Sequence, residues 1–182
     1  YSLFAQEEKP EPVVVNGDTV EYLTEGKEVS ATGNVSVVYK GAKLTCDKLI
    51  VNTQTKNGVA TGNARLDDKG GVIEGDEIRY NFQTKVGTIV KPNFRSSPYF
   101  GKAGNLKKIS DAEFIAKRGY ITTCSYNTPH YRIRSRKIDF FPQDKVKTRD
   151  DIFYIGRAPL FCIPQYNHSL KDPLVHVQLM AG

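Results

Sequence analysis

Residues 17–22 read Gly-Asp-Thr-Val-Glu-Tyr, and the chain returns to this pattern twice. The second copy, Cys-Asp-Lys-Leu-Ile-Val, occupies residues 46–51, and the third, Gly-Asp-Glu-Ile-Arg-Tyr, occupies residues 75–80. Successive copies lie 29 residues apart, and the tetrapeptide Ala-Thr-Gly-Asn recurs at residues 31–34 and 60–63. A repeat of this length is typical of stacked supersecondary units that cover one another's apolar faces.

The aspartates of the three copies, Asp18, Asp47 and Asp76, recur with the repeat itself. Aspartate side chains often hydrogen-bond to backbone amides at turns. We therefore predict that these three residues cap turns at the starts of strands. The third copy loses the pattern near Pro92.

The repeated units have the period of β-strands. Val35 and Val37 flank Ser36, and turn residues follow at Lys40-Gly41 and again at Lys56-Asn57-Gly58. This spacing predicts strands of roughly 8–11 residues joined by short turns.

The second half of the chain also has a β pattern after an interruption. The segment from Pro92 to Gly104 is rich in Pro, Ser, Gly and aromatic residues, and we expect a long loop there. Strands are predicted again at 112–123, 131–138, 145–155 and 159–163. The sequence therefore predicts one elongated all-β body of a dozen or so strands, with an unpaired strand at each end.

Length and composition fit a single globular domain. The chain has 182 residues, of which 39% are hydrophobic and 25% charged, so a core can form and wholesale disorder is excluded. No run of 18 apolar residues is present, which excludes a membrane-spanning helix. The net charge of +6 suits an anionic partner, either nucleic acid, a membrane surface or a phosphorylated ligand, and selects none of them.

The cysteines and the N-terminus bear on the compartment. Cys46, Cys124 and Cys162 form no C-x-x-C pair, which argues against a zinc ribbon or a thioredoxin-type redox site. The number is odd, so in an oxidising compartment at least one thiol is free or pairs outside this chain. Residues 1–6 are mostly apolar and precede a polar, proline-bearing stretch, as at the end of a secretory signal peptide cleaved after Ala5.

The alternation predicts which side chains point inward. These positions are Val20, Tyr22, Val35, Val37, Leu44, Leu49, Val51, Ala60, Leu66, Ile73, Ile78 and Tyr80. They either fill a dry core or line a groove for an acyl chain, and small residues such as Ala31 and Ala64 fit both interpretations. Burying a dozen methylenes would contribute on the order of 10 kcal/mol before binding costs, so such a groove needs no catalytic group.

A basic run places Arg132, Arg134 and Arg136 on one face of a strand. The run is either a solvated face or an anion-facing strip beside the groove, suited to phosphates. We do not expect nucleic-acid binding, because the aromatic residues Phe140 and Phe141 have core spacing and form no exposed stacking platform.

We expect no enzymatic activity, no cofactor and no metal. The chain has no H-E-x-x-H, no G-x-S-x-G and no glycine-rich phosphate loop, and its three histidines, His130, His168 and His176, lie in unrelated settings.

These residues resemble a known family. The Gly-Asp-x-Val-x-Tyr and Ala-x-Gly-Asn-Val patterns between Gly17 and Val90 resemble the OstA-type domain of the lipopolysaccharide-transport proteins, the LptA/LptD family. Residues 120–124, 128–131 and 154–164 resemble the stretch that leads from this domain into the barrel of the outer-membrane member, LptD. The resemblance covers roughly residues 13–170.

The resemblance implies a twisted open antiparallel β-jellyroll built from stacked repeats. It also implies a role at the periplasmic face of the outer membrane in a Gram-negative bacterium, where the domain receives lipopolysaccharide (LPS) from a periplasmic LptA-like bridge protein. The acyl chains would follow the apolar groove towards the outer-membrane barrel and its lipoprotein plug, LptE. The partner edge strand would be Thr19, Val20, Glu21 and Tyr22, which would pair with the bridge protein.

The resemblance also bears on the cysteines and on domain boundaries. Cys124 matches the family position that forms a disulfide to the barrel, whereas Cys46 and Cys162 have no counterpart and are expected to be plain buried thiols. Residues 1–12 would be a signal-peptide remnant and linker, 13–170 the jellyroll, and 171–182 the start of a connection to a barrel that is missing here. Two alternatives stay open: a stand-alone LptA-like bridge protein, and a dry structural connector that pairs strands with partners at both ends.

Overall fold

The computed structural model describes residues 14–23, 26–39, 41–69, 71–142 and 144–171. The predicted N-terminal linker at 1–12 and, apart from Lys171, the predicted connection at 171–182 lie outside the described residues. The strands are β1 (Val14–Asn16), β2 (Thr19–Leu23), β3 (Glu28–Tyr39), β4 (Ala42–Asn52), β5 (Asn57–Asp68), β6 (Gly71–Asn81), β7 (Gly87–Val90), β8 (Asn93–Ser96), β9 (Tyr99–Lys102), β10 (Asn105–Ser110), β11 (Glu113–Thr122), β12 (Tyr131–Phe141), β13 (Lys145–Ile155) and β14 (Ala158–Ser169). The described part of the chain holds no helix suited to crossing a membrane.

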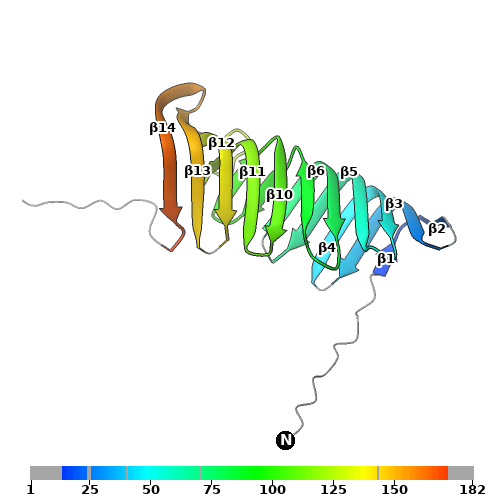
Figure 1. The fold of residues 1–182 in the computed structure, drawn as a ribbon. Coiled ribbons are helices and arrows are strands. Elements are labelled where there is room, and N and C mark those ends of the chain that lie inside the picture. The colour runs from blue at the N-terminus through cyan, green and yellow to red at the C-terminus, as the bar shows by residue number, and fades with distance from the viewer. Residues whose placement is uncertain (1–13, 24–25, 40, 70, 143, 172–182) are drawn as a thin grey trace, which may run out of the picture.

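All strands belong to one antiparallel sheet, which confirms the predicted all-β class. Each long strand pairs with the next in sequence, from β3 to β6 and again from β11 to β14. Figure 1 shows them stacked side by side along the long axis of the molecule. The fold is a twisted open β-jellyroll whose ends are β1 and β2 on one side and β14 on the other.

The long strands bend near their middles because one or two residues there adopt left-handed backbone angles. The φ angles are +74° at Gly33, +47° at Asn34, +73° at Gly62 and +46° at Asn63. The register of β3 against β4 shifts at the same place, between residues 32 and 35. Such bulges bend the strands, so the sheet folds over and its two halves face each other across an apolar interior.

The repeated aspartates hold these bends, and the prediction that they cap strand starts is wrong for Asp47 and Asp76. Both lie inside long strands, β4 and β6. Asp47 Oδ2 accepts a hydrogen bond of 2.9 Å from Asn63 Nδ2, and Asp76 Oδ2 lies 2.7 Å from Lys91 Nζ. Asp18 Oδ2 likewise accepts from Asn34 Nδ2, at 3.1 Å. Each copy of the repeat therefore supplies an Asp whose carboxylate binds a residue at a nearby bend.

The segment from Pro92 to Gly104, which we predicted as a long loop, instead contributes β8 and β9. β8 pairs with the first half of β6, and β9 pairs with the last part of β11. β7 and β8 thus act together as one long strand broken at Lys91 and Pro92, and β9 and β10 as a second one. The stacking of the repeats continues where the sequence pattern fades, because backbone pairing does not need the repeated side chains.

Candidate functional site

The apolar interior contains most of the residues that the alternation placed inward. Ten of the twelve are buried, with relative exposures of at most 5%. They are Val35, Val37, Leu44, Leu49, Val51, Ala60, Leu66, Ile73, Ile78 and Tyr80. They belong to β3, β4, β5 and β6, and they form one continuous core with side chains from β7 to β13.

Val20 and Tyr22, which were also predicted to point inward, are not buried. Val20 is 39% exposed and Tyr22 is 76% exposed. Cross-strand pairing places Val20 opposite the buried Ala31, so it does lie on the interior face. The exposure of Val20 and Tyr22 follows from their position, because β2 lies at the end of the stack and no further strand among the described residues covers that face.

An apolar slit lies in the middle of the interior, between the two facing halves of the sheet. Its space, including the mouth, amounts to about 370 Å³. The lining residues are Val72, Ile73, Phe94, Arg95, Ser96, Leu106, Phe114, Ala116, Ile138 and Phe140. The slit is narrow, with room for only about one water-sized sphere at a time. In this conformation side chains fill the interior, and the two halves would have to separate for an acyl chain to enter.

Phe94 and Leu106 are lining residues that the sequence analysis missed. Phe94 fell in the segment predicted to be a loop, and Leu106 lay between that segment and the strand predicted at 112–123. The aromatic content of residues 94–100 was the available signal, because Phe94, Tyr99 and Phe140 pack ring against ring.

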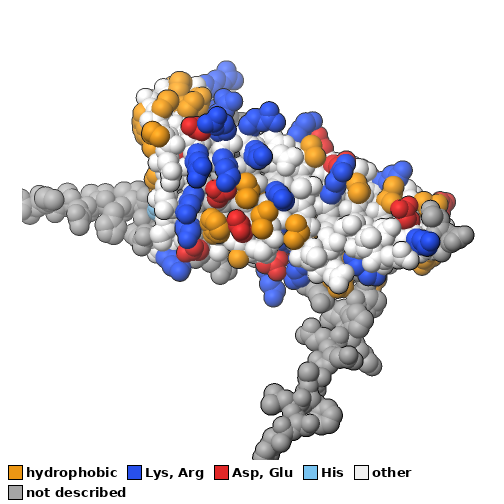
Figure 2. All heavy atoms as spheres, viewed as in Figure 1, with side chains coloured by type: hydrophobic (Ala, Val, Ile, Leu, Met, Phe, Trp, Pro, Cys, Tyr) orange, Lys and Arg blue, Asp and Glu red, His pale blue; other side chains and the backbone are white. Residues whose placement is uncertain are grey.

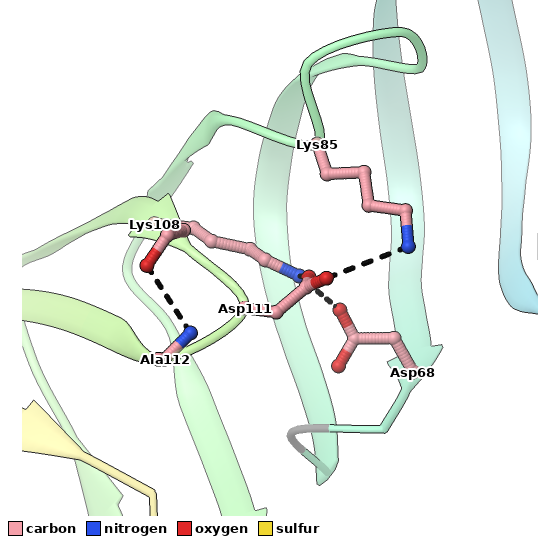
Figure 3. Close-up of polar contacts among 6 residues, drawn as sticks. Asp68, Lys85, Lys108, Asp111 and Ala112 are labelled. Atoms are coloured by element: carbon pink, nitrogen blue, oxygen red, sulfur yellow. Dashed lines mark hydrogen bonds and ion pairs between the residues drawn. The ribbon is translucent and has the colours of Figure 1, made fainter. Parts of the chain in front are cut away.

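A buried lysine closes one edge of the interior (Figure 3). Lys108, on β10, is 1% exposed and forms ion pairs with Asp68, at the end of β5, and with Asp111. Its Nζ also lies 5.6 Å from the ring centre of Phe114, and Lys85 reaches Asp111 from the β6–β7 turn at 3.4 Å. These contacts join strands from both halves of the chain.

The electrostatics of this cluster follow from burial and pairing. Burial lowers the pKa of Lys108, but its hydrogen bonds to Asp68 and Asp111 outweigh that effect, so the net pKa is raised above 10.5. The same contact lowers the pKa of Asp111 below 3.8. Burial raises the pKa of the nearby Tyr80 hydroxyl to about 12. Lys108 and Asp111 are therefore both charged at neutral pH.

The interior becomes polar towards its C-terminal end. Thr148 and Asp151, both on β13, are buried, and the Thr148 hydroxyl donates a hydrogen bond of 2.5 Å to Asp151 Oδ2. Ser135, on β12, is buried beside them. The apolar surface of the interior is thus interrupted before β14.

The basic strip lies on the outer surface of the sheet. Arg132 and Arg134 alternate with Ile133 and Ser135, which face inward. Arg132 donates a hydrogen bond to the Gly156 carbonyl at 2.6 Å. Two of the three strip residues are therefore engaged within the chain, since Arg136 also pairs with Asp150. Arg134 is exposed.

The three cysteines are free thiols in different environments. Cys46 is buried, and burial raises its pKa to about 11. Cys124 is also buried, with its Sγ 3.7 Å from Nδ1 of His130. The expectation that Cys162 is buried is wrong: it is exposed on the edge strand β14.

The predicted partner strand, β2, lies at an edge of the sheet. β2 pairs with β3 on one side, and its other side has no strand neighbour among the described residues. All five of its residues are exposed. β14 occupies the corresponding place at the other end of the stack.

The described residues contain no group of three or more His, Cys, Asp or Glu side chains that could hold a metal ion. The candidate site is an apolar interior enclosed by an open β-jellyroll. A buried ion-pair cluster lies at one edge of it.

No family model and no curated protein matches this chain. Among solved structures, the chain is similar to the crystal structure of LptH from Pseudomonas aeruginosa, described as the LptA homologous periplasmic component of the conserved lipopolysaccharide transport device. The two sequences are 16% identical, and the similar region covers 53% of this chain and 75% of that chain, with a TM-score of 0.48.

Proposed function

We propose that this chain is a periplasmic lipopolysaccharide-transport domain that guides acyl chains through the interior of its jellyroll. The observation that carries the proposal is the slit lined by Leu106, Phe114, Ile138 and Phe140, whose surface is almost wholly apolar. An acyl chain is recognised by apolar surface alone, and burying a dozen methylenes contributes on the order of 10 kcal/mol before binding costs.

In this proposal LPS enters at one end of the stack of strands and leaves at the other. LPS would arrive from an LptA-like bridge protein that adds a strand to β2, since this edge is exposed and has an unpaired side. The sugars and phosphates would stay outside, where Arg134 and other basic side chains lie on the outer surface. The acyl chains would leave near β14.

The more specific part of the proposal is that the domain belongs to an LptD-like protein. It rests on the sequence resemblance of residues 120–124 and 154–164. In that case the domain would deliver LPS to an outer-membrane barrel with its plug LptE, and Cys124 would be the thiol that pairs with the barrel.

A second candidate function is a dry structural connector. The observation that favours it is the tight packing of the interior, where Ala60 and Ile78 are fully buried and the slit has little free width. A connector would need only its two exposed edge strands, β2 and β14.

Two neighbouring phenylalanines separate the two functions. Phe140 is buried and lines the slit, whereas Phe141 is partly exposed on the opposite face of the same strand. Benzoylphenylalanine would replace each in turn, and the folded protein would be irradiated in the presence of LPS. The transport function predicts adducts at position 140 and few at position 141.

Lack of adducts at position 140, with circular dichroism showing an intact fold, would favour the connector. Equal labelling at both positions would indicate adsorption of LPS to the surface and would also contradict transport through the interior. The same substitution at Phe114, against Ile115 as control, checks that the outcome does not depend on one site.

A further inference from the structure

The end of the β13–β14 hairpin is an exposed apolar surface. Four side chains there are strongly exposed: Ile155 at 55%, Leu160 at 53%, Phe161 at 51% and Tyr131, on the adjacent β12, at 40%. We call these four residues the tip surface. Figure 1 shows the hairpin reaching beyond the ends of the neighbouring strands, and Figure 2 shows hydrophobic side chains gathered there next to Lys and Arg.

The tip surface is continuous with the interior face of the sheet. Tyr131 pairs with Ile155 across β12 and β13, and Ile133 pairs with Phe153 two residues further in. The Phe153 ring stacks on Phe161 with the ring centres 5.1 Å apart, and Ile133 packs against the buried core. Apolar contacts thus run from the core through Ile133 and Phe153 to the exposed hairpin, next to the buried polar residues Ser135 and Asp151.

The segments that form the tip surface carry charge of one sign, and the exposed Asp150, further along β13, is paired with Arg136. Residues 114–138 and 152–171 contain no aspartate and no glutamate, whereas Arg132, Arg134 and Arg157 lie in these segments. A surface that combines exposed aromatic and aliphatic side chains with cations and no anions matches the interface of a bilayer with anionic headgroups.

The hairpin is held in its shape by contacts that do not use the tip residues. The guanidinium of Arg132 lies 4.7 Å from the ring centre of Tyr154 and donates to the Gly156 carbonyl. The Gly156 amide donates a hydrogen bond of 2.6 Å to the His130 carbonyl. The apolar side chains are therefore presented on a supported turn, and little ordering is needed on docking.

We propose that the tip surface docks on the surface of a lipid bilayer that carries anionic headgroups. Apolar side chains would enter the boundary between headgroups and acyl chains, while Arg134 and Arg157 would contact lipid phosphates. This inference rests on the exposure and charge of the hairpin and does not depend on the proposed transport of LPS.

The absence of tryptophan from the sequence allows a clean test. The variant L160W places a single indole on the tip surface, and Y22W places one on the exposed strand at the opposite end. Each 182-residue variant would be mixed with phosphatidylcholine vesicles containing phosphatidylglycerol, and with brominated lipid as quencher. We expect a blue shift and quenching for L160W, and neither for Y22W.

A second variant tests how much the basic side chains contribute to vesicle binding. Each basic residue near an anionic surface contributes roughly 1 kcal/mol, or about fivefold in partitioning, so R134Q/R157Q should lower vesicle binding by about 25-fold. Both arginines are surface residues, and F161W provides a second reporter if L160W folds poorly.

Three results would overturn the proposal. They are an unchanged L160W spectrum in a folded protein, equal responses from L160W and Y22W, or a blue shift without lipid that grows with protein concentration. The last would identify a second copy of the chain as the occupant of the tip surface.

Discussion

Lys108 Nζ lies 2.9 Å from Oδ1 of Asp111, although the lysine side chain is only 1% exposed. The same ammonium group pairs with Asp68, whose side chain is 8% exposed. Removing one partner of a buried ion pair leaves a charge without compensation, which costs more than the pair contributes when intact.

We therefore expect Lys108→Met to destabilise the protein by about 3 kcal/mol, measured by urea unfolding. Lys107 is the matched control, because it is exposed on the opposite face of the same strand, and Lys107→Met should change stability by less than about 0.5 kcal/mol. The double variant K108L/D68L, which removes both charges, should recover part of the loss. If K108M and K107M are equally stable, the cluster does not support the fold.

The stability contributed by this cluster should depend on pH in a defined direction. Asp111 has a pKa below 3.8 in the folded state, so its contribution is complete above that value and is lost as the pH falls through the folded pKa. Lys108 has a pKa above 10.5, so its contribution is complete below that value and is lost as the pH rises further. The difference in unfolding free energy between wild type and K108M should thus be constant near neutral pH and shrink at both extremes. A difference that is flat down to about pH 2 would contradict this assignment.

The bends of the long strands can be tested at a repeated glycine. Gly62 has a φ angle of +73°, and a Cβ built there would lie 2.5 Å from Asp47 Oδ2. Gly26 has a similar φ angle of +79° but nothing within 4 Å of such a Cβ. We expect Gly26→Ala to cost about 1 kcal/mol for the backbone angle alone, and Gly62→Ala to cost at least about 1 kcal/mol more because the Asp47 contact is disrupted. Thermal unfolding of the two variants measures the difference, and equal losses would mean that Asp47 moves aside at no cost.

The three cysteine thiols should react with an aromatic disulfide at different rates in the native protein. Cys162 is exposed, whereas Cys46 is buried and its pKa of about 11 leaves little thiolate at neutral pH. Titration with an aromatic disulfide should show one fast thiol, and Cys162→Ser should abolish that phase. All three cysteines should react at once in denaturant. A fast phase that survives in C162S would place Cys124 or Cys46 in contact with solvent.

The parts of the fold that were predictable from sequence are those set by local alternation. Val35, Val37 and Ile78 were predicted to face inward and are buried, because residues two apart on a strand share a face. Val20 was assigned to the correct face but to the wrong environment. Alternation specifies a direction, whereas burial also needs a neighbouring strand on that side.

The elements that were missed depend on contacts between distant parts of the chain. Lys108 and Asp68 are 40 residues apart, and a lysine at an inward position gives no apolar signal. Asn34 was recognised within the repeat, but a left-handed angle at a non-glycine residue is not visible in a hydrophobic pattern. The hairpin of β8 and β9 was hidden because its Pro, Ser and Gly content resembles that of a loop.

The 29-residue interval, seen first as a sequence repeat, also sets a physical length. Each interval supplies two neighbouring strands, and strands in a sheet are spaced by about 4.8 Å, so one repeat extends the molecule by about 10 Å. Each bend is held by its adjacent strand, and one copy can be inserted or removed without altering the geometry of the others. The length of such a molecule is therefore set by the number of repeat copies in its sequence.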